Sequence, residues 1–430
     1  MNTKRFFVLL MALTGCSAEP GTDGQERLGS AEAALLSPGD AMCGRGPSGI
    51  SCVRSTGTSF GSASVWSSSF SDANGWNTHA SYYFTIRYPD VNGDGDTDVC
   101  GRAVSGIKCA LSTGTSFNSY STWSSDFSDA NGWSLSQYYP TIQYPDLNGD
   151  GRADVCGRAA SGVKCAVSTG TGFGSYGLWA STFSDANGYQ TAPYGGTVQF
   201  GDLNGDGDSD ICGRGVSGMK CGLSNGTGFN AVTVWSSDFS DANGWNVASS
   251  YETIKLVDVN NDGMDDICGR GSSGMKCALS TGSAFGSLAV WQPAATAFSD
   301  ANGYNTSSIY PTIKYGDLNA DGFPDVCVRA SSGVKCALSS GSGFGAASIW
   351  SSTYSDAGGW NSQGYYSTIQ LSDLNNDGRA DVCGRGGSGL KCALSSGSAF
   401  GTVTTWSSFF SDANSWDQVS YFRSLAFSDP

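Results

Sequence analysis

Fourteen of the 15 cysteines fall into seven pairs that share one internal spacing. The pairs are Cys43 with Cys52, Cys100 with Cys109, Cys156 with Cys165, Cys212 with Cys221, Cys268 with Cys277, Cys327 with Cys336, and Cys383 with Cys392. Two other markers also occur seven times: a Phe-Ser-Asp-Ala-Asn-Gly-Trp segment with its variants, between Phe70 and Trp416, and a tryptophan shortly before each copy. Successive pairs lie 56 to 59 residues apart. Such a repeat constrains the fold strongly, because each unit must bury its apolar face against its neighbours.

Each repeat carries the signals of four short antiparallel strands. In one copy, residues 141–144 predict a first strand, residues 154–158 and 163–168 a hairpin around a Ser-Gly turn, and the segment through Trp179 a last strand. No segment shows helical periodicity. Four strands per repeat, seven times over, predict an all-β fold: a seven-bladed β-propeller with four-stranded antiparallel blades.

The two ends of the repeat array complement each other. The first unit lacks the initial strand and a full Asp/Asn loop, whereas residues 421–429 resemble that missing strand. We therefore expect the C-terminal strand to complete the N-terminal blade and close the ring, which removes the exposed sheet edges that favour aggregation. An open solenoid is the alternative. The propeller domain is predicted to span residues 38–430.

The N-terminus is typical of an export signal. Lys4 and Arg5 precede a short apolar stretch over residues 6–13, which is too short to span a bilayer. Leu13-Thr14-Gly15-Cys16 resembles the bacterial lipobox. That resemblance implies a lipoprotein signal peptide over residues 1–15, lipidation of Cys16, and a flexible tether over residues 16–37. The alternative is an ordinary signal peptide with an incidental cysteine.

The predicted location follows from that lipobox. Ser17 after the cysteine resembles the sorting pattern of bacterial outer-membrane lipoproteins, so we expect an exported protein that faces the periplasm or the cell surface. Membrane contact is expected only through the lipid. The net charge of −15 and the lack of a basic stripe exclude a nucleic-acid partner, because phosphate binding needs a basic surface.

The seven cysteine pairs are predicted to be disulfides. Each pair brackets a tight hairpin, where opposed residues lie close enough to be bridged. Zinc ligation is disfavoured, because zinc sites want a C-x2–4-C spacing with further Cys or His ligands, and His79 is the only histidine. Disulfides in this number suit an oxidising compartment.

A D-x-N-x-D-G-x-x-D motif occurs six times and predicts about six Ca²⁺ sites. Its alternate spacing turns several oxygens toward one centre, and Ca²⁺ takes six to eight oxygen ligands where Mg²⁺ prefers a tighter octahedron. A set of solvated Asx turns is the alternative. The predicted ligands are Asp90, Asn92, Asp94 and Asp98; Asp146, Asn148, Asp150 and Asp154; Asp202, Asn204, Asp206 and Asp210; Asp258, Asn260, Asp262 and Asp266; Asp317, Asn319, Asp321 and Asp325; and Asp373, Asn375, Asp377 and Asp381.

At these loops the chain resembles the FG-GAP and VCBS repeat families, which include the integrin α-subunit propeller. An upstream Phe-Gly, as at Phe60-Gly61 and Phe173-Gly174, belongs to the same resemblance, although Phe117 and Phe229 are followed by Asn. The order of motifs is still more similar to that of the seven-bladed mushroom lectins that bind N-acetylglucosamine. The cysteine pairs and the Gly-Arg after each first cysteine depart from that lectin pattern. The resemblance implies a calcium-binding propeller.

Two repeated features are candidates for a ligand site. The Ser-Asp-Ala-Asn-Gly-Trp turns combine an aromatic face with polar side chains, which suits carbohydrate; the predicted ligand-binding residues are Asp72, Asn74, Trp76, Asp129, Asn131, Trp133, Asp241, Asn243 and Trp245. The alternative is that each tryptophan packs between blades. An arginine also follows each first cysteine by two residues, and we interpret it as a buried partner of the turn aspartate. These arginines are Arg45, Arg102, Arg158, Arg214, Arg270, Arg329 and Arg385.

Repetition favours binding over catalysis, because a catalytic site needs unique residues. We expect no enzyme activity and interpret the exposed-loop residue His79 as incidental. The leading hypothesis is a monomeric, calcium-stabilised, surface-anchored module that binds carbohydrate or acts in adhesion. An envelope scaffold with a surface protein ligand is the alternative, and a calcium-dependent polysaccharide-active enzyme is a weaker third.

Overall fold

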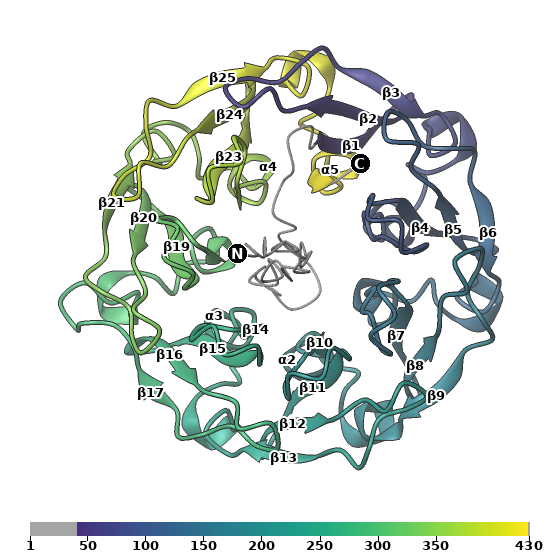
Figure 1. The fold of residues 1–430 in the computed structure, drawn as a ribbon, viewed down its shortest axis with the longest axis horizontal. Coiled ribbons are helices and arrows are strands. Elements are labelled where there is room, and N and C mark those ends of the chain that lie inside the picture. The colour runs from purple at the N-terminus through teal and green to yellow at the C-terminus, as the bar shows by residue number, and fades with distance from the viewer. Residues whose placement is uncertain (1–40, 429–430) are drawn as a thin grey trace, which may run out of the picture.

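The computed structural model describes residues 41–428, which form seven β-sheets arranged radially around one axis (Figure 1). Each sheet is one blade, and consecutive blades follow the chain around the ring. The predicted seven-bladed, all-β propeller with antiparallel blades is confirmed.

The strands have the following bounds. Blade 1 contains β26 (Ala426–Ser428), β1 (Ala41–Gly46), β2 (Gly49–Arg54) and β3 (Ser64–Ser67); blade 2, β4 (Val99–Ala103), β5 (Gly106–Ala110) and β6 (Ser121–Ser124); blade 3, β7 (Val155–Ala159), β8 (Gly162–Ala166) and β9 (Gly177–Ala180). Blade 4 contains β10 (Gln199–Gly201), β11 (Asp210–Gly215), β12 (Gly218–Gly222) and β13 (Thr233–Ser236); blade 5, β14 (Lys255–Val257), β15 (Asp266–Gly271), β16 (Gly274–Ala278) and β17 (Ala289–Val290). Blade 6 contains β18 (Lys314–Gly316), β19 (Asp325–Ala330), β20 (Gly333–Ala337) and β21 (Ser348–Ser351); blade 7, β22 (Gln370–Ser372), β23 (Asp381–Gly386), β24 (Gly389–Ala393) and β25 (Thr404–Ser407).

Blades 2 and 3 have a shortened innermost strand. Their first strand is reduced to single bridges, Arg87 to Cys100 and Gln143 to Cys156, so the strand predicted over residues 141–144 is wrong in extent. Pro89 and Pro145 follow these bridges, at the ladder position that glycine holds in β10 and β18. Proline has no N–H to donate, so the ladder stops there.

The ring closes as predicted, through the two ends of the described chain. Strand β26 pairs antiparallel with β1, with Met42 opposite Phe427 and Cys43 opposite Ala426. The last strand therefore completes the first blade, and the described part of the chain has no free sheet edge at this joint.

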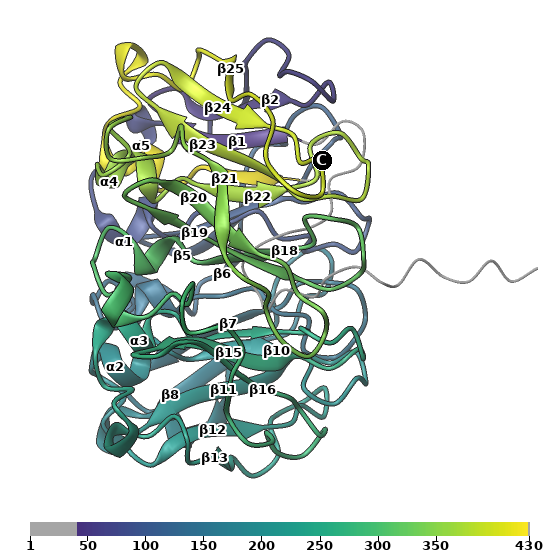
Figure 2. The ribbon, with the colours of Figure 1, turned by 90° about the vertical axis from the view of Figure 1, so that its left-hand side faces the viewer.

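Short helices, which the sequence did not predict, lie between the outer strand of one blade and the inner strand of the next. Figure 2 shows that the labelled helices gather on one face of the ring, which we call the helix face. The α-helices are α1 (Ala80–Tyr83), α2 (Ala192–Gly195), α3 (Ala248–Tyr251), α4 (Gln363–Tyr366) and α5 (Val419–Phe422). The 3-10 helices are η1 (Asp72–Asn74), η2 (Asp129–Asn131), η3 (Tyr139–Thr141), η4 (Ser181–Phe183), η5 (Asp185–Asn187), η6 (Asp241–Asn243), η7 (Asp300–Asn302), η8 (Tyr310–Thr312) and η9 (Asp412–Asn414).

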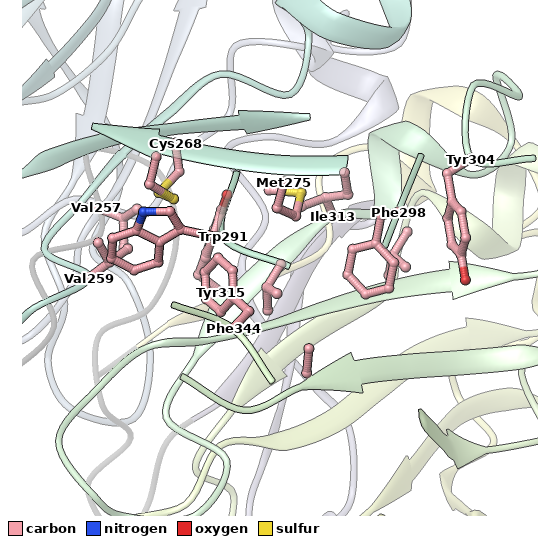
Figure 3. Close-up of a cluster of buried hydrophobic side chains, with 14 of the residues drawn as sticks. Val257, Val259, Cys268, Met275, Trp291, Phe298, Tyr304, Ile313, Tyr315 and Phe344 are labelled. Carbon is pink, nitrogen blue, oxygen red and sulfur yellow. A yellow bond between two sulfur atoms is a disulfide. The ribbon is translucent and has the colours of Figure 1, made fainter. Parts of the chain in front are cut away.

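The apolar core lies between the blades. One cluster joins Val257, Met275 and Trp291 of blade 5 to Tyr315 and Phe344 of blade 6 (Figure 3). The Trp291 and Phe344 rings lie 5.5 Å apart, and a tryptophan–phenylalanine contact of this kind recurs at every junction around the ring. Each blade is therefore stabilised by its neighbours rather than by a core of its own.

All seven predicted disulfides are present, and in each hairpin the two cysteines are directly opposed, with Cα atoms 4.1 to 4.2 Å apart. Bridges of this number indicate a protein that folds in an oxidising compartment, as exported proteins do. The structure joins Cys43 to Cys52, Cys100 to Cys109, Cys156 to Cys165, Cys212 to Cys221, Cys268 to Cys277, Cys327 to Cys336, and Cys383 to Cys392.

The predicted signal peptide over residues 1–15, the lipidated Cys16 and the tether over residues 16–37 lie outside the described residues. Within residues 41–428, none of the helices is long and apolar enough to cross a bilayer.

Candidate functional site

The seven repeated arginines are buried and paired with the turn aspartates, as predicted. Arg102 is fully buried; its Nε donates to the carbonyl of Phe127 at 2.9 Å, its Nη1 to that of Ser81 at 3.3 Å, and its Nη2 to Asp129. Burial lowers the pKa of Arg102 to about 10, so it keeps its charge at neutral pH. The ion pairs are Arg45–Asp72, Arg102–Asp129, Arg158–Asp185, Arg214–Asp241, Arg270–Asp300, Arg329–Asp356 and Arg385–Asp412.

A tyrosine holds the second oxygen of five of these aspartates, a contact that the sequence analysis missed. Tyr138, for example, donates its hydroxyl to Oδ2 of Asp185 at 2.5 Å. The same bond joins Tyr82 to Asp129, Tyr194 to Asp241, Tyr365 to Asp412 and Tyr421 to Asp72. A repeated Tyr-x-x-Thr/Ser pattern was the available signal. Both oxygens of these carboxylates are therefore engaged inside the protein.

The turn tryptophans pack between blades. Trp76, Trp133 and Trp245 are only 1 to 2% exposed. A Cβ atom added at Gly157 would lie 2.5 Å from Trp133, so the indole lies directly on the glycine backbone of the next blade. The rings therefore offer no open face to a sugar, and the stacking role predicted for them is corrected to inter-blade packing.

The turn asparagines also have internal partners. Nδ2 of Asn131 donates to the carbonyl of Asp126 at 2.9 Å, and Asn74 and Asn243 make equivalent bonds to the chain before the turn. Of the nine residues predicted to bind a ligand, the asparagines thus bond their own turn, the aspartates pair with buried arginines, and the tryptophans pack between blades.

The six Asp/Asn loops lie between the first two strands of blades 2 to 7, where they were predicted. In each loop, Oδ2 of the first aspartate accepts the N–H of the glycine five residues later, as Asp90 does from Gly95 at 2.9 Å. Nδ2 of each asparagine donates to the central aspartate, as Asn92 does to Asp94 at 2.7 Å.

The last aspartate of each loop is an internal anchor. Both oxygens of Asp98 accept backbone N–H bonds, one from Val91 at 3.1 Å and one from Ser112 at 2.7 Å, and the other five loops repeat this pair. Burial raises the pKa of Asp98 to about 7, although these two bonds lower it; the charges of Asp94 and Asp90 raise it further.

Neighbouring loops are joined to each other across the blade junctions. The N–H of Ala153 donates to the carbonyl of Asp90 at 2.7 Å, and Oγ of Ser168 donates to the carbonyl of Val91 at 2.6 Å. A change in one loop therefore acts on the contact between two blades.

The donor set of these loops fits Ca²⁺ in its chemistry, because it is made only of oxygens. Asp265 adds a further observation: it is 2% exposed, neither of its carboxylate oxygens has a hydrogen-bond partner within the described chain, and its own N–H donates to Asp202 of the preceding loop. Across residues 41–428, however, no three acidic, histidine or cysteine side chains are arranged to hold a metal ion. Ion binding thus requires side chains such as Asn92 and Asp94 to turn toward a common centre.

A groove on the outer part of the ring marks the junction between blades 2 and 3. It has a volume of about 290 Å³ and is lined by residues 122–126 of blade 2 and 173–175 of blade 3. Trp123 and Phe173 belong to its lining, with ring centres 5.3 Å apart, and Trp123 is only 5% exposed. Thr122, Ser125 and Asp126 provide polar groups. We call it the junction groove.

A larger cavity of about 690 Å³ lies on the propeller axis and is lined by residues from all seven blades. His79, the single histidine, is exposed, and its ring centre lies 5.2 Å from that of Tyr82. It does not line this axial cavity.

Comparison with known proteins agrees with this architecture. A family model described as an FG-GAP-like repeat matches residues 146–213 and 317–384. No curated protein sequence matches the chain. A solved structure of an Agrocybe aegerita lectin, described as specifically recognising non-reducing terminal N-acetylglucosamine, is similar with a TM-score of 0.81 and 23% identity, over 92% of this chain and 96% of the lectin.

A weaker likeness, with a TM-score of 0.43 and 16% identity, covers 73% of this chain and 13% of a Photorhabdus luminescens Tc holotoxin pore chain. The chain is a seven-bladed β-propeller that contains FG-GAP-like repeats. It shares its whole fold with the lectin.

Proposed function

We propose that this propeller binds carbohydrate at its blade junctions and is not an enzyme. The observation that carries the proposal is the junction groove, which brings hydroxyl groups and the Asp126 carboxylate beside the partly buried ring of Phe173. Sugars present apolar C–H faces and hydroxyl rims, which match such a surface. The tryptophan–phenylalanine pair recurs at all seven junctions, and Asp238 of blade 4 holds the place of Asp126. A second site of the same kind beside Asp238 would give avidity toward a multivalent glycan.

The shared fold of the N-acetylglucosamine-specific lectin supports this class of ligand. Terminal N-acetylglucosamine is therefore the first sugar to test. The proposal also includes Ca²⁺ in the six Asp/Asn loops, where it would neutralise crowded carboxylates and stiffen the contacts between blades. Surface display from an outer-membrane lipid anchor at Cys16 completes it, supported by the lipobox-like segment and the seven disulfides.

A glycan array tests the proposal. We expect binding to glycans with terminal N-acetylglucosamine, and weaker binding by the double variant Asp126→Asn, Asp238→Asn. Asparagine keeps an oxygen that can accept the Tyr176 and Leu288 N–H bonds, so the fold is preserved while the groove charge is lost. Asp417→Asn, at an exposed position, is the control for charge. An array without any bound glycan, with calcium present, contradicts the proposal.

A further inference from the structure

Seven residues at one structural register line the axial cavity. Each lies on the innermost strand or bridge of its blade, opposite the first cysteine of the disulfide. We call them the channel girdle: Arg87, Gln143, Gln199, Lys255, Lys314, Gln370 and Ala426. Because every blade contributes one member, the girdle surrounds the axis.

The girdle is basic in an otherwise acidic protein. It contains three cations, three glutamines and one alanine, and none of the seven is acidic, whereas the whole chain has a net charge of −15. Arg87 lies in blade 2, and Lys255 and Lys314 lie in blades 5 and 6, so positive charge approaches the axis from separate sides. A small anion on the axis would be attracted from more than one direction.

The glutamines show what the fold itself requires at this register. Nε2 of Gln143 donates to the carbonyl of Val198 at 2.9 Å, and Nε2 of Gln370 to that of Leu425 at 3.0 Å. Oε1 of Gln199 accepts the N–H of Leu256 at 3.2 Å. A neutral amide thus links adjacent innermost strands, and three blades close the ring without a cation.

The basic side chains are positioned at the cavity wall. Nη1 of Arg87 donates to the carbonyls of Phe84 and Ile86, at 3.0 and 2.8 Å, which fixes the guanidinium at the cavity. Arg423 also lines the cavity, with its guanidinium carbon 5.8 Å from the centre of the Phe84 ring. Among the described residues that line the cavity, Glu252 is the one acidic member.

The lining also contains aromatic and hydroxyl groups. Tyr251 and Phe422 border the cavity, and both belong to helices of the helix face. Glu252 is itself hydrogen-bonded to the side chains of Tyr310 and Tyr251, so it is held by the rim. The volume of about 690 Å³ lies within the range of small-ligand sites.

We propose that the axial cavity is a second binding site, for one acidic saccharide whose carboxylate lies among Arg87, Lys255 and Lys314. Charge-assisted hydrogen bonds would hold the carboxylate, while the tyrosines and amides contact the sugar hydroxyls. The site is separate from the junction grooves and binds one ligand per chain. Binding at the axial cavity does not depend on recognition of N-acetylglucosamine at the junction grooves.

Titration calorimetry of the purified full chain with glucuronate tests this site. We expect saturable binding with one equivalent per chain, weakened about tenfold or more in the triple variant Arg87→Gln, Lys255→Gln, Lys314→Gln, because three charge-assisted contacts are lost. Glutamine is the residue that blades 3, 4 and 7 already carry at this register, so the three changes to glutamine should preserve folding. Lys220→Gln, Lys276→Gln, Lys335→Gln makes the same charge change on β12, β16 and β20, away from the cavity lining, and should bind as the wild type does.

Equal glucuronate affinity in the two triple variants, or no binding by the wild type, overturns the axial site. Titration with glucose, which lacks the carboxylate of glucuronate, tests whether the charge or the sugar ring determines the affinity. Equal affinity for the two sugars also overturns the proposal. Failure of N-acetylglucosamine binding with glucuronate binding retained would refute the junction-groove function alone. The two proposals therefore fail independently.

Discussion

Tyr421 donates its hydroxyl to Oδ2 of Asp72 at 2.6 Å, across the joint where β26 and β1 close the ring. Arg45 holds the other oxygen of the same carboxylate. Loss of this bond should therefore weaken ring closure.

Tyr421→Phe removes only the hydroxyl. We expect the free energy of unfolding to fall by about 1 to 2 kcal/mol, because a partly buried carboxylate loses a donor. Chemical denaturation measures the change. Tyr304→Phe is the control, since Tyr304 is not one of the five tyrosines that bond a turn aspartate. An equal loss in both variants would contradict a specific role for the joint.

The same hydroxyl predicts a pH dependence. Burial and the bond to Asp72 raise the pKa of Tyr421 from 10.0 to about 12. Because this pKa is raised, the folded state favours the protonated phenol. The stabilising contribution of the Tyr421 hydroxyl is therefore complete below pH 10 and is lost as the pH rises toward 12. The difference in stability between wild type and Tyr421→Phe should therefore narrow above pH 10. A difference that stays constant up to pH 12 would refute this assignment.

The buried arginines predict a large loss for a single substitution. Arg102→Met removes the donor to Asp129 and the bonds to two carbonyls, and we expect about 3 kcal/mol of destabilisation, as for other broken buried ion pairs. Arg152→Met breaks the partly exposed pair with Asp150, whose side chains are 33% and 25% exposed, and should cost less than about 1 kcal/mol. Similar losses in free energy of unfolding in the two variants would show that Arg102 contributes no more to stability than the partly exposed Arg152 does.

The junction of Trp133 with Gly157 predicts compensation between two blades. Gly157→Val places a side chain against the indole and Trp133→Tyr leaves a gap, so each should destabilise by about 1 to 3 kcal/mol. Blade 6 already has Val328 at the position of Gly157, and the turn that follows blade 5 has Tyr304 at the position of Trp133. The double variant should therefore be more stable than the sum of the two losses, which a double-mutant cycle measures. If the two losses in free energy of unfolding simply add in the double variant, direct contact between Trp133 and residue 157 is contradicted.

The Asp/Asn loops predict stabilisation by calcium. Elemental analysis should find about six Ca²⁺ per chain, and each site adds about 2.7 kcal/mol when the free ion is a hundredfold above its Kd. Removal of calcium with a chelator should lower the melting temperature, and Mg²⁺ should restore it less well. An identical melting temperature with and without the chelator would rule out a structural ion.

Particular residues show how far the sequence predicts this structure. The shared register of Cys100 and Cys109 predicted both the hairpin and its disulfide, and residues 421–428 predicted closure of the ring. The pairing of Arg102 with Asp129 followed from burial, because an unpaired buried arginine is costly. The cysteine, arginine and aspartate positions repeat in every blade, so their pattern is visible in one sequence.

Other features depend on distances that one sequence does not contain. Trp133 lies in a polar turn, as an aromatic residue that stacks on a sugar would. Its burial against the glycine backbone of the next blade becomes visible only in the structure. The channel girdle varies from Arg87 to Gln143 to Lys255, so no motif marks it, although the topology brings its members together. The short first strands of blades 2 and 3 had a local signal in Pro89 and Pro145.

The most direct measurement is titration of the calcium-loaded protein with a disaccharide that ends in N-acetylglucosamine. A propeller with carbohydrate sites at its junctions should give saturable heat with more than one equivalent bound per chain, and Asp126→Asn, Asp238→Asn should reduce the affinity or the number of sites. The absence of saturable binding at millimolar sugar would contradict carbohydrate recognition at the blade junctions.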